Sequence, residues 1–172
     1  MAEKTIVPFG DPILRKIAKP VVEFNAKLAK LLDDMVDTLY AAEGRAGLAA
    51  PQIGILKRVV VMDCGDGLIE LINPEIVESH GEQIGAEGCL SLPGYSGIVK
   101  RTHSVKVKSR TRTGESFLLE AEDYLAVCIQ HEIDHLDGIL YVDRIEGSNF
   151  FHDRSKQKAN LLEVLRLTNQ NV

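Results

Sequence analysis

The five residues H-E-I-D-H at positions 131–135 constrain the fold of this chain more than any other segment. Histidines four positions apart lie on one side of an α-helix, because each turn takes 3.6 residues. The preceding positions, 125–129, are apolar, so we expect this helix to be buried. It is predicted to span Asp123–Asp137 and to end at Gly138. Buried imidazoles and a buried carboxylate need partners, which must come from other parts of the chain.

The same run has the spacing of a metal site. The side chains of His131 and His135 can reach one ion, and Glu132 can hold a water beside it without being a ligand. An ordinary helix with surface or core histidines is the alternative interpretation, which the apolar preceding turns disfavour. The pattern therefore predicts metal-assisted hydrolysis, for which a tetrahedral site needs a third protein ligand.

The third ligand has several candidates on spacing alone. Any carboxylate is a candidate, and so are three further histidines: His80, His103 and His152. Cys64 and Cys128 lie in apolar segments and are expected to be core thiols. Cys89 differs, because it follows the glycine-containing segment 85–88, where the backbone can approach a ligand closely. A thiolate is also a tight metal ligand.

Length and charge limit the class of protein. The chain has 172 residues, of which 45% are hydrophobic and 26% charged, so we expect one domain over residues 1–172. The net charge of −5 disfavours DNA binding, because phosphates need basic partners. No apolar run approaches the roughly 20 residues of a membrane span, and no signal segment is recognisable, so we expect a cytoplasmic protein. Three cysteines, an odd number, argue against a disulfide framework.

Hydrophobic patterns predict an α+β fold. A short helix is expected from Asp11-Pro12, and a longer one from the N-cap Asn25 to about Glu43. Strand-like segments cluster in the middle of the chain, at 58–63, 68–72, 75–79, 99–110 and 116–119. A short strand at 139–145 and a helix at 151–167 complete the chain. We therefore expect mixed or antiparallel β-sheets around a central buried metal-binding helix, with N-terminal and C-terminal helices.

Three segments together resemble peptide deformylase. They are G-L-A-A-P-Q-I-G at 47–54, E-G-C-L-S at 87–91 and Q-H-E-I-D-H at 130–135. Their order and spacing also match this family, and the resemblance covers most of the chain. It implies a metal-dependent hydrolase that removes the formyl group from N-formylmethionine at the N-terminus of newly made peptides and releases formate. The implied partners are N-formylmethionyl nascent peptides of the bacterial type.

The resemblance implies a role for each residue of the centre. Cys89, His131 and His135 would bind one divalent ion. In the family this ion is usually Fe²⁺, while Zn²⁺ and Ni²⁺ can take the same place. A metal-bound water would attack the formyl carbon, with Glu132 as the general base.

Further roles are implied around the substrate. The Gln52 side chain and the Leu90 backbone N–H would stabilise the oxyanion, although an isolated loop glutamine can instead satisfy nearby backbone. Gly47 would admit the substrate backbone, which pairs like an added strand, and a helix C-cap is the alternative for this glycine. Arg45 and Ala46 depart from the usual glycine and aliphatic residue. Because these residues lie beside the substrate groove, we expect their departure from the family pattern to alter KM or peptide preference more than kcat.

The substrate methionine requires an apolar pocket. Tyr124, Val127 and Cys128 would line it, with simple core packing as the alternative. Glu87 and Arg101 could pair and fix the cysteine loop, unless they are unrelated surface charges.

Other functions remain open from the residues alone. They are a metallopeptidase with a different third ligand, a metal-free acyl hydrolase with Cys89 as nucleophile, and a catalytically silent module that binds nascent chains. The last predicted helix could also dock on the ribosome, with a solvated helix face as the alternative. Its basic residues are Arg154, Lys156, Lys158 and Arg166.

Overall fold

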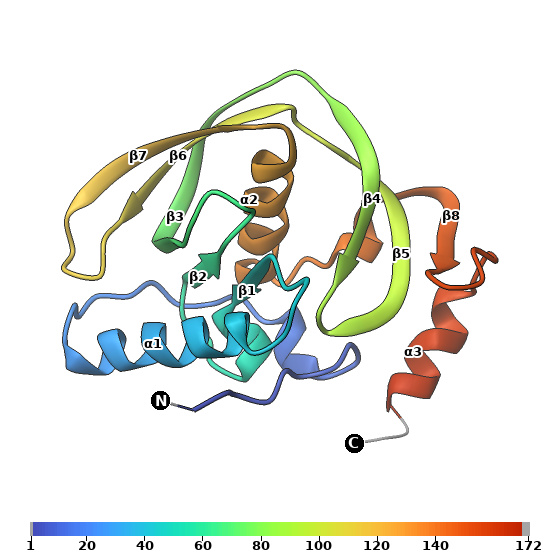
Figure 1. Ribbon diagram of the computed structural model, residues 1–172, viewed down its shortest axis with the longest axis horizontal. Helices are drawn as coiled ribbons and strands as arrows, with labels where there is room; N and C mark the ends of the chain where they lie inside the picture. The colour runs from blue at the N-terminus through green and yellow to red at the C-terminus, as the bar shows by residue number, and fades with distance from the viewer. Residues whose placement is uncertain (1, 170–172) are drawn as a thin grey trace.

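The computed structural model describes residues 2–169, which form two antiparallel β-sheets and three α-helices (Figure 1). The larger sheet has the strand order β1-β2-β3-β6-β7, and the smaller has the order β4-β5-β8. The strands are β1 Gly47–Ala49, β2 Val59–Met62, β3 Ile69–His80, β4 Gln83–Cys89, β5 Leu92–Arg101, β6 Ser104–Arg110, β7 Ser116–Glu122 and β8 Ile145–His152. The helices are α1 Ala26–Tyr40, α2 Asp123–Leu136 and α3 Leu161–Asn169. The predicted α+β class is confirmed.

Helix α2 lies between the two sheets, with β3 on one side and β4 on the other (Figure 1). It has the predicted bounds to within one residue. Ile129 and Ile133 pack against the five-stranded sheet. Gly138 follows the helix with a φ of 70°, a conformation that glycine adopts without strain.

Strand β2 shows how the larger sheet is covered on both faces. All four of its residues are buried. Successive side chains alternate, so Val60 and Met62 join the core around α2, while Val59 and Val61 join the core around α1. Helix α1 contributes one apolar stripe to the second core, formed by Leu28, Leu31, Leu32, Met35 and Leu39.

Helix α1 begins where the sequence predicts. The side chain of Asn25 accepts hydrogen bonds from the N–H groups of Lys27 and Leu28 at 3.1 and 3.2 Å. The helix ends at Tyr40, earlier than the predicted Glu43. Gly47 lies in β1, so its interpretation as a helix C-cap is wrong.

Two predicted strands, 68–72 and 75–79, are parts of the single strand β3. A change of register between Ile72 and Glu75 separates them. Asn73 lies in this bulge with a φ of 51°, and its side chain bonds both polar backbone groups of Val21. The bulge interrupts the alternation of apolar and polar residues, so the sequence pattern indicated two strands instead of one continuous strand.

The predicted strand 99–110 is instead the end of β5 and all of β6. The chain leaves the sheet at Thr102, whose N–H donates to the Gln130 side chain of α2 at 3.1 Å. Strand β4 was not predicted, because Gly85 and Gly88 interrupt its apolar pattern.

The chain after α2 differs most from the prediction. Residues expected as a strand at 139–145 contain a 3-10 helix, Tyr141–Arg144, because the Asp143 carboxylate accepts the Leu140 N–H at 2.9 Å. The helix expected at 151–167 is also wrong in its limits. Strand β8 continues to His152, and α3 begins only at Leu161. Between residues 2 and 169, no helix is both long enough and apolar enough to span a lipid bilayer.

Candidate metal centre and active site

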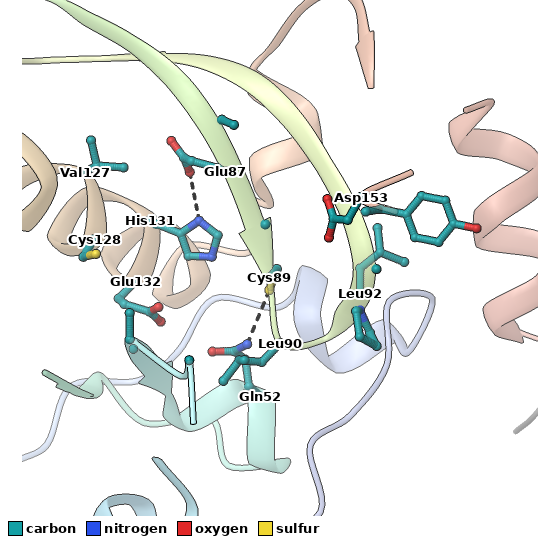
Figure 2. A pocket seen from close by; sticks show the side chains of 18 of the residues that line it. Gln52, Glu87, Cys89, Leu90, Leu92, Val127, Cys128, His131, Glu132 and Asp153 are labelled. Carbon is teal, nitrogen blue, oxygen red and sulfur yellow. Dashed lines mark hydrogen bonds and ion pairs between the residues drawn. The ribbon is translucent and has the colours of Figure 1, made fainter. Parts of the chain in front are cut away.

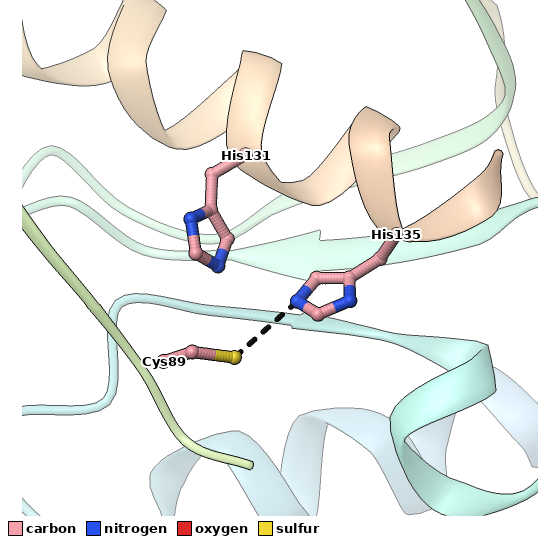
Figure 3. A group of neighbouring side chains, drawn as sticks. All are labelled: Cys89, His131 and His135. Carbon is pink, nitrogen blue, oxygen red and sulfur yellow. Dashed lines mark hydrogen bonds between the residues drawn. The ribbon is translucent and has the colours of Figure 1, made fainter. Parts of the chain in front are cut away.

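Two pairs of side chains from different elements face each other at the centre of the site. His131 and His135 share one side of α2, while Glu87 and Cys89, two positions apart, share one face of β4. His131 Nδ1 lies 2.9 Å from Glu87 Oε1. His135 Nε2 lies 3.4 Å from Cys89 Sγ (Figure 3). The periods of a helix and a strand therefore bring a thiol and two imidazoles together.

Cys89, His131 and His135 offer donor atoms that all lie within 4.8 Å of one another. No other set of three such groups is as close in the described part of the chain. The remaining histidines lie elsewhere. His80 is exposed, and His103 binds Asp123 at 2.8 Å. His152 stacks edge-on against Tyr95.

The protonation state of His135 suits binding to a cation. Burial and the charges of His131 and Arg101 lower the pKa of His135 well below its usual value, so its imidazole is neutral and keeps a free lone pair. Burial also opposes charge on His131, but hydrogen bonds with Cys89 and Glu87 raise its pKa. His135 Nδ1 is buried without a hydrogen-bond partner among the described residues. Sulfur and imidazole donors in this arrangement fit a divalent transition ion.

Glu132 is buried beside the three donors. Burial raises its pKa to about 7, with the nearby Glu87 adding to the effect. Its Oε2 atom has no hydrogen-bond partner within residues 2–169. Gly47 of β1 lies directly against it, because a Cβ at position 47 would be 2.5 Å from Glu132 Oε1. The glycine thus leaves room for the carboxylate.

An ionic network, buried except for the exposed Arg144, holds His131 in place. Arg101 of β5 donates two hydrogen bonds to Glu87, both at 2.8 Å, and a third to Asp134 at 2.6 Å. Arg144 donates to the same Asp134 at 2.6 and 2.8 Å. Burial raises the pKa of Glu87, but Arg101 and His131 lower it to about 2, so the carboxylate stays charged. The expected pairing of Glu87 with Arg101 is present, and these two residues are not surface charges.

A cavity of about 290 Å³ opens beside the donors (Figure 2). Gln52 forms part of its wall and is fixed at both ends of its amide. Its Oε1 accepts the Ala49 N–H at 2.9 Å, and its Nε2 lies 3.3 Å from Ser91 Oγ and 3.5 Å from Cys89 Sγ. The amide therefore satisfies local backbone and also faces the sulfur.

The same cavity is lined by Leu90, the other residue expected to stabilise the oxyanion, and by the residues expected to bind substrate. The latter are Ala46, Gly47, Tyr124, Val127 and Cys128. Arg45 lies at an adjoining cavity. Its guanidinium bonds the Thr38 carbonyl of α1 and lies 3.3 Å from Glu3 Oε1.

Several residues of the site were missed by sequence reasoning. Asp134 and Arg144 complete the ionic network, and Ser91 holds the Gln52 amide. Asp153 lines the far end of the cavity and accepts a hydrogen bond from Ser96 at 2.5 Å. Asp134 and Ser91 had a local signal, because they lie inside the motifs at 130–135 and 87–91.

Comparison with known proteins agrees with this geometry. The sequence profile of the polypeptide deformylase family matches residues 3–150. A peptide deformylase of Heliobacterium modesticaldum is 59% identical over 149 residues, which cover 87% of this chain and 98% of that protein. The chain belongs to the peptide deformylase family.

Solved peptide deformylase structures share the fold. The enzyme from Legionella pneumophila is 42% identical, with a TM-score of 0.83 over 99% of this chain and 95% of its own. The enzyme from Thermus thermophilus is 37% identical, with a TM-score of 0.86 over 98% of this chain and 99% of its own. Peptide deformylases are metalloenzymes that remove the N-formyl group from nascent peptides, so the predicted family and enzyme class are confirmed. The three rival functions are set aside by this assignment.

Proposed function

We propose that this chain, as one catalytic domain over residues 1–172, hydrolyses the formyl amide of N-formylmethionyl peptides in the cavity beside α2. The convergence of Cys89, His131 and His135 next to the buried carboxylate of Glu132 carries this proposal. The three donors are the proposed ligands of one divalent ion. Glu87 fixes His131 by its bond to Nδ1, which leaves the other ring nitrogen free for the ion.

Fe²⁺ is the proposed physiological ion, and Zn²⁺ or Ni²⁺ can occupy the same ligands in a preparation. One thiolate and two imidazoles are donors that all three ions accept. When bound, the ion supplies Lewis acidity, which makes a water easier to deprotonate and polarises the formyl carbonyl.

Glu132 is the proposed general base. It accepts a proton as a water oxygen attacks the formyl carbon, and it returns the proton to the amine as the C–N bond breaks. The products are formate and a peptide with a free N-terminal amine. A pKa of about 7, caused by burial, lets this carboxyl group take and give a proton near neutral pH.

The negative charge that develops on the formyl oxygen needs nearby donors. The Gln52 amide and the Leu90 backbone N–H are the proposed donors. The hydrogen bond from Ala49 N–H to Gln52 Oε1 orients the amide so that its NH₂ group faces Cys89. This fixed orientation supports the assignment, because the donor is held in place before substrate binds.

The walls of the cavity support a proposed position for the substrate. Its backbone would pass Ala46 and Gly47, and its methionine side chain would contact Tyr124, Val127 and Cys128. Arg45 is proposed to affect peptide preference only beyond this cavity, because its side chain is bound to the end of α1.

We further propose a cytoplasmic location and contact with the ribosome. The basic residues considered for docking are exposed, which leaves their charge available to nucleic acid phosphates. Arg166 is in α3. The other three, Arg154, Lys156 and Lys158, lie in the segment between β8 and α3. Cosedimentation with ribosomes, lost when the four are replaced by glutamine, would support this contact.

The proposed site is tested by measuring bound metal together with formate release from formyl-Met-Ala. Cys89→Ala should lose metal and activity together. Glu132→Ala should keep its metal but lose activity by about 10²–10⁴-fold, the usual contribution of a general base. Full metal occupancy in Cys89→Ala, or near-normal turnover in Glu132→Ala, would contradict the assignments.

A further inference from the structure

A second, smaller cavity lies beside the one proposed for the substrate. Its volume is about 170 Å³, compared with about 290 Å³ for the first. Four residues line both cavities: Ala86, Glu87, Tyr124 and Val127. These residues therefore form a partition between the two spaces, and their positions decide how far the substrate cavity extends.

Three of the four residues in the partition are fixed by their surroundings. Ala86 lies in the middle of β4, a strand that is paired with β5. Val127 lies on α2 (Figure 2), and Glu87 is held by Arg101. Tyr124 differs, because it is the second residue of α2 and is 58% exposed. The position of its ring therefore depends on the backbone at the start of the helix.

The residue before Tyr124 has an unusual backbone conformation. Asp123 has a φ of 53°, and among residues 2–169 only two other residues with a side chain have a positive φ. Aspartate and asparagine tolerate this conformation better than most residues, but even they adopt it rarely. It persists only where the surrounding structure holds it, and such positions are frequent at binding sites.

Three contacts hold Asp123 in this conformation. Its N–H donates to the His103 carbonyl at 3.1 Å, and its carboxylate lies 2.8 Å from His103 Nε2. Its own carbonyl accepts a hydrogen bond from Gln83 Nε2 at 3.0 Å. The same Gln83 amide binds the carbonyls of Thr102 and His103, at 3.0 and 3.3 Å. Because Gln83 begins β4, these bonds tie the start of α2 to the strand that carries the other side of the partition.

We propose that Asp123 is a positioning residue whose backbone conformation places the Tyr124 ring between the two cavities and so limits the length of the substrate's first side chain. His103 and Gln83 maintain this conformation and act through Asp123. The inference rests on the proposed function, which places the methionine side chain against Tyr124 and Val127. Without the partition, the methionine pocket would continue into the smaller cavity and accept a longer side chain.

Two formyl dipeptides that differ only in side-chain length measure this limit. Norleucine has an unbranched side chain of nearly the length of methionine, and 2-aminooctanoic acid is two methylene groups longer. We expect kcat/KM of the parent enzyme for formyl-norleucyl-alanine to exceed that for formyl-2-aminooctanoyl-alanine by about tenfold or more, the usual range for apolar pockets that discriminate methylene groups. Equal values for the two peptides would overturn the proposal.

Substitution of Tyr124 tests the partition itself. Tyr124→Ala removes the ring and should lower the ratio of the two kcat/KM values to about one. The change should appear as a lower KM for the longer peptide, at unchanged metal content, because the partition contributes to binding and does not touch the reacting atoms. Tyr124→Phe keeps the ring and should restore the ratio. An unchanged ratio in Tyr124→Ala would overturn the proposal.

Substitutions of Asp123 separate the backbone conformation from the carboxylate. Asp123→Gly loses the carboxylate but adopts a positive φ freely, so it should keep the ratio of the parent. Asp123→Val disfavours a positive φ because its side chain is β-branched, so it should give the ratio of Tyr124→Ala. Asp123→Ala gives the same comparison where Asp123→Val does not fold. Glu122→Val is the matched control, since Glu122 has an extended φ of −133° and no side-chain cap bond, and it should match the parent.

The outcomes distinguish this inference from the proposed function. Equal ratios in Asp123→Gly and in the alanine or valine variant would overturn the inference, because the backbone conformation would then not decide selectivity. A parent enzyme that releases formate from formyl-Met-Ala while these ratios stay equal leaves the proposed function intact. No formate release from any of the three peptides would instead reject the proposed function, and this inference with it.

Discussion

At the scale of single residues, Gly47 shows why one position of the site accepts no side chain. Its α-carbon lies so close to Glu132 that an added Cβ would fall 2.5 Å from Oε1 and 2.9 Å from the carboxylate carbon. A Cβ atom cannot form a hydrogen bond, and contacts this short with carbon or oxygen are strongly repulsive. The glycine thus fixes where the proposed base can lie, in addition to any contact that it makes with substrate.

Gly47→Ala should therefore act on Glu132. We expect the carboxylate to be displaced, so that kcat falls by about 10²-fold or more while metal content stays unchanged. Formate release and metal analysis check both parts. Gly85→Ala is the matched control, because a Cβ there meets nothing within 4 Å. Equal kcat values for the two variants would show that the close approach has no catalytic consequence.

The sequence was sufficient for residues whose roles depend on local spacing. His131, Glu132 and His135 follow from one helical turn, and Cys89 followed from its resemblance to a family motif. Arg144 and Asp153 could not be found in this way, and the motif that contains Ser91 did not indicate its contact with Gln52. Their partners are distant in sequence, so only the folded chain brings them to the site.

At the scale of elements, Arg101 connects the β4–β5 pair to α2. It is buried and binds Glu87 on β4 and Asp134 on α2. Glu87 in turn holds His131, while Asp134 lies next to His135 in the sequence. The arginine thus fixes the relative position of the strand and the helix that carry the proposed ligands.

Arg101→Leu and Glu87→Gln should each weaken metal binding by about 10- to 100-fold, the usual effect of losing a group that orients a ligand. The two losses should not add in the double variant, because both remove the same support. Metal affinity measured by competition with a chelator gives this cycle. Lys100→Leu is the control, since its partner Glu82 is exposed and distant from the ligands. Additive losses would show that the two residues act separately.

A second connection joins the 3-10 helix Pro12–Arg15 to the segment after α2. Arg15 donates to both oxygens of Asp143, at 2.5 and 3.1 Å, and Asp143 also accepts the Leu140 N–H. Burial raises the pKa of Asp143, but the hydrogen bonds from Arg15 and Leu140 together outweigh this effect, so the pKa lies below its usual value in the folded state. A depressed folded pKa stabilises the protein above the unfolded value, and this stabilisation is lost as pH falls through the folded value.

Asp143→Ala should therefore lower stability by roughly 1 kcal/mol at neutral pH, mainly through the lost cap. The difference in Tm from the parent should be constant from about pH 5 to 8 and shrink below about pH 4. Thermal unfolding over this range checks it. A difference that grows as pH falls would have the opposite sign and contradict the assignment.

The elements that were predicted correctly are those with a regular apolar period. Helices α1 and α2 have such a period over three to four turns. Strand β4 has no such pattern, because its glycines contribute no side chains. The segment 151–160 has charges that suit a helix, but Phe150 and Phe151 pair with β5, and Asn160 delays the helix by accepting the Leu162 N–H at 3.0 Å. Pairing with β5 therefore made the start of this segment a strand, although its local sequence favours a helix.

At the scale of the whole molecule, the proposed ion would join the smaller sheet to the helix that is packed on the larger sheet. Cys89 belongs to the smaller sheet, while His131 and His135 belong to the helix packed on the larger sheet. Binding to the folded chain alone stabilises it by mass action. A chelator should therefore lower Tm by about 5–10 °C, for an ion present at 100 times its Kd.

Added Zn²⁺ should restore the original Tm. Cys89→Ala is the matched variant, and its Tm should not change with either chelator or metal. An equal shift in Cys89→Ala would place the stabilising ion elsewhere.

The strand order of the smaller sheet has a consequence for the end of the chain. Strand β5 is its middle strand, with β4 on one side and β8 on the other. If the chain stopped before Ile145, one side of β5 would have free amide and carbonyl groups facing water. Such an open edge recruits strands from other copies, so shortened chains would aggregate even though every proposed ligand is still present. The last strand thus contributes to solubility as well as to shape.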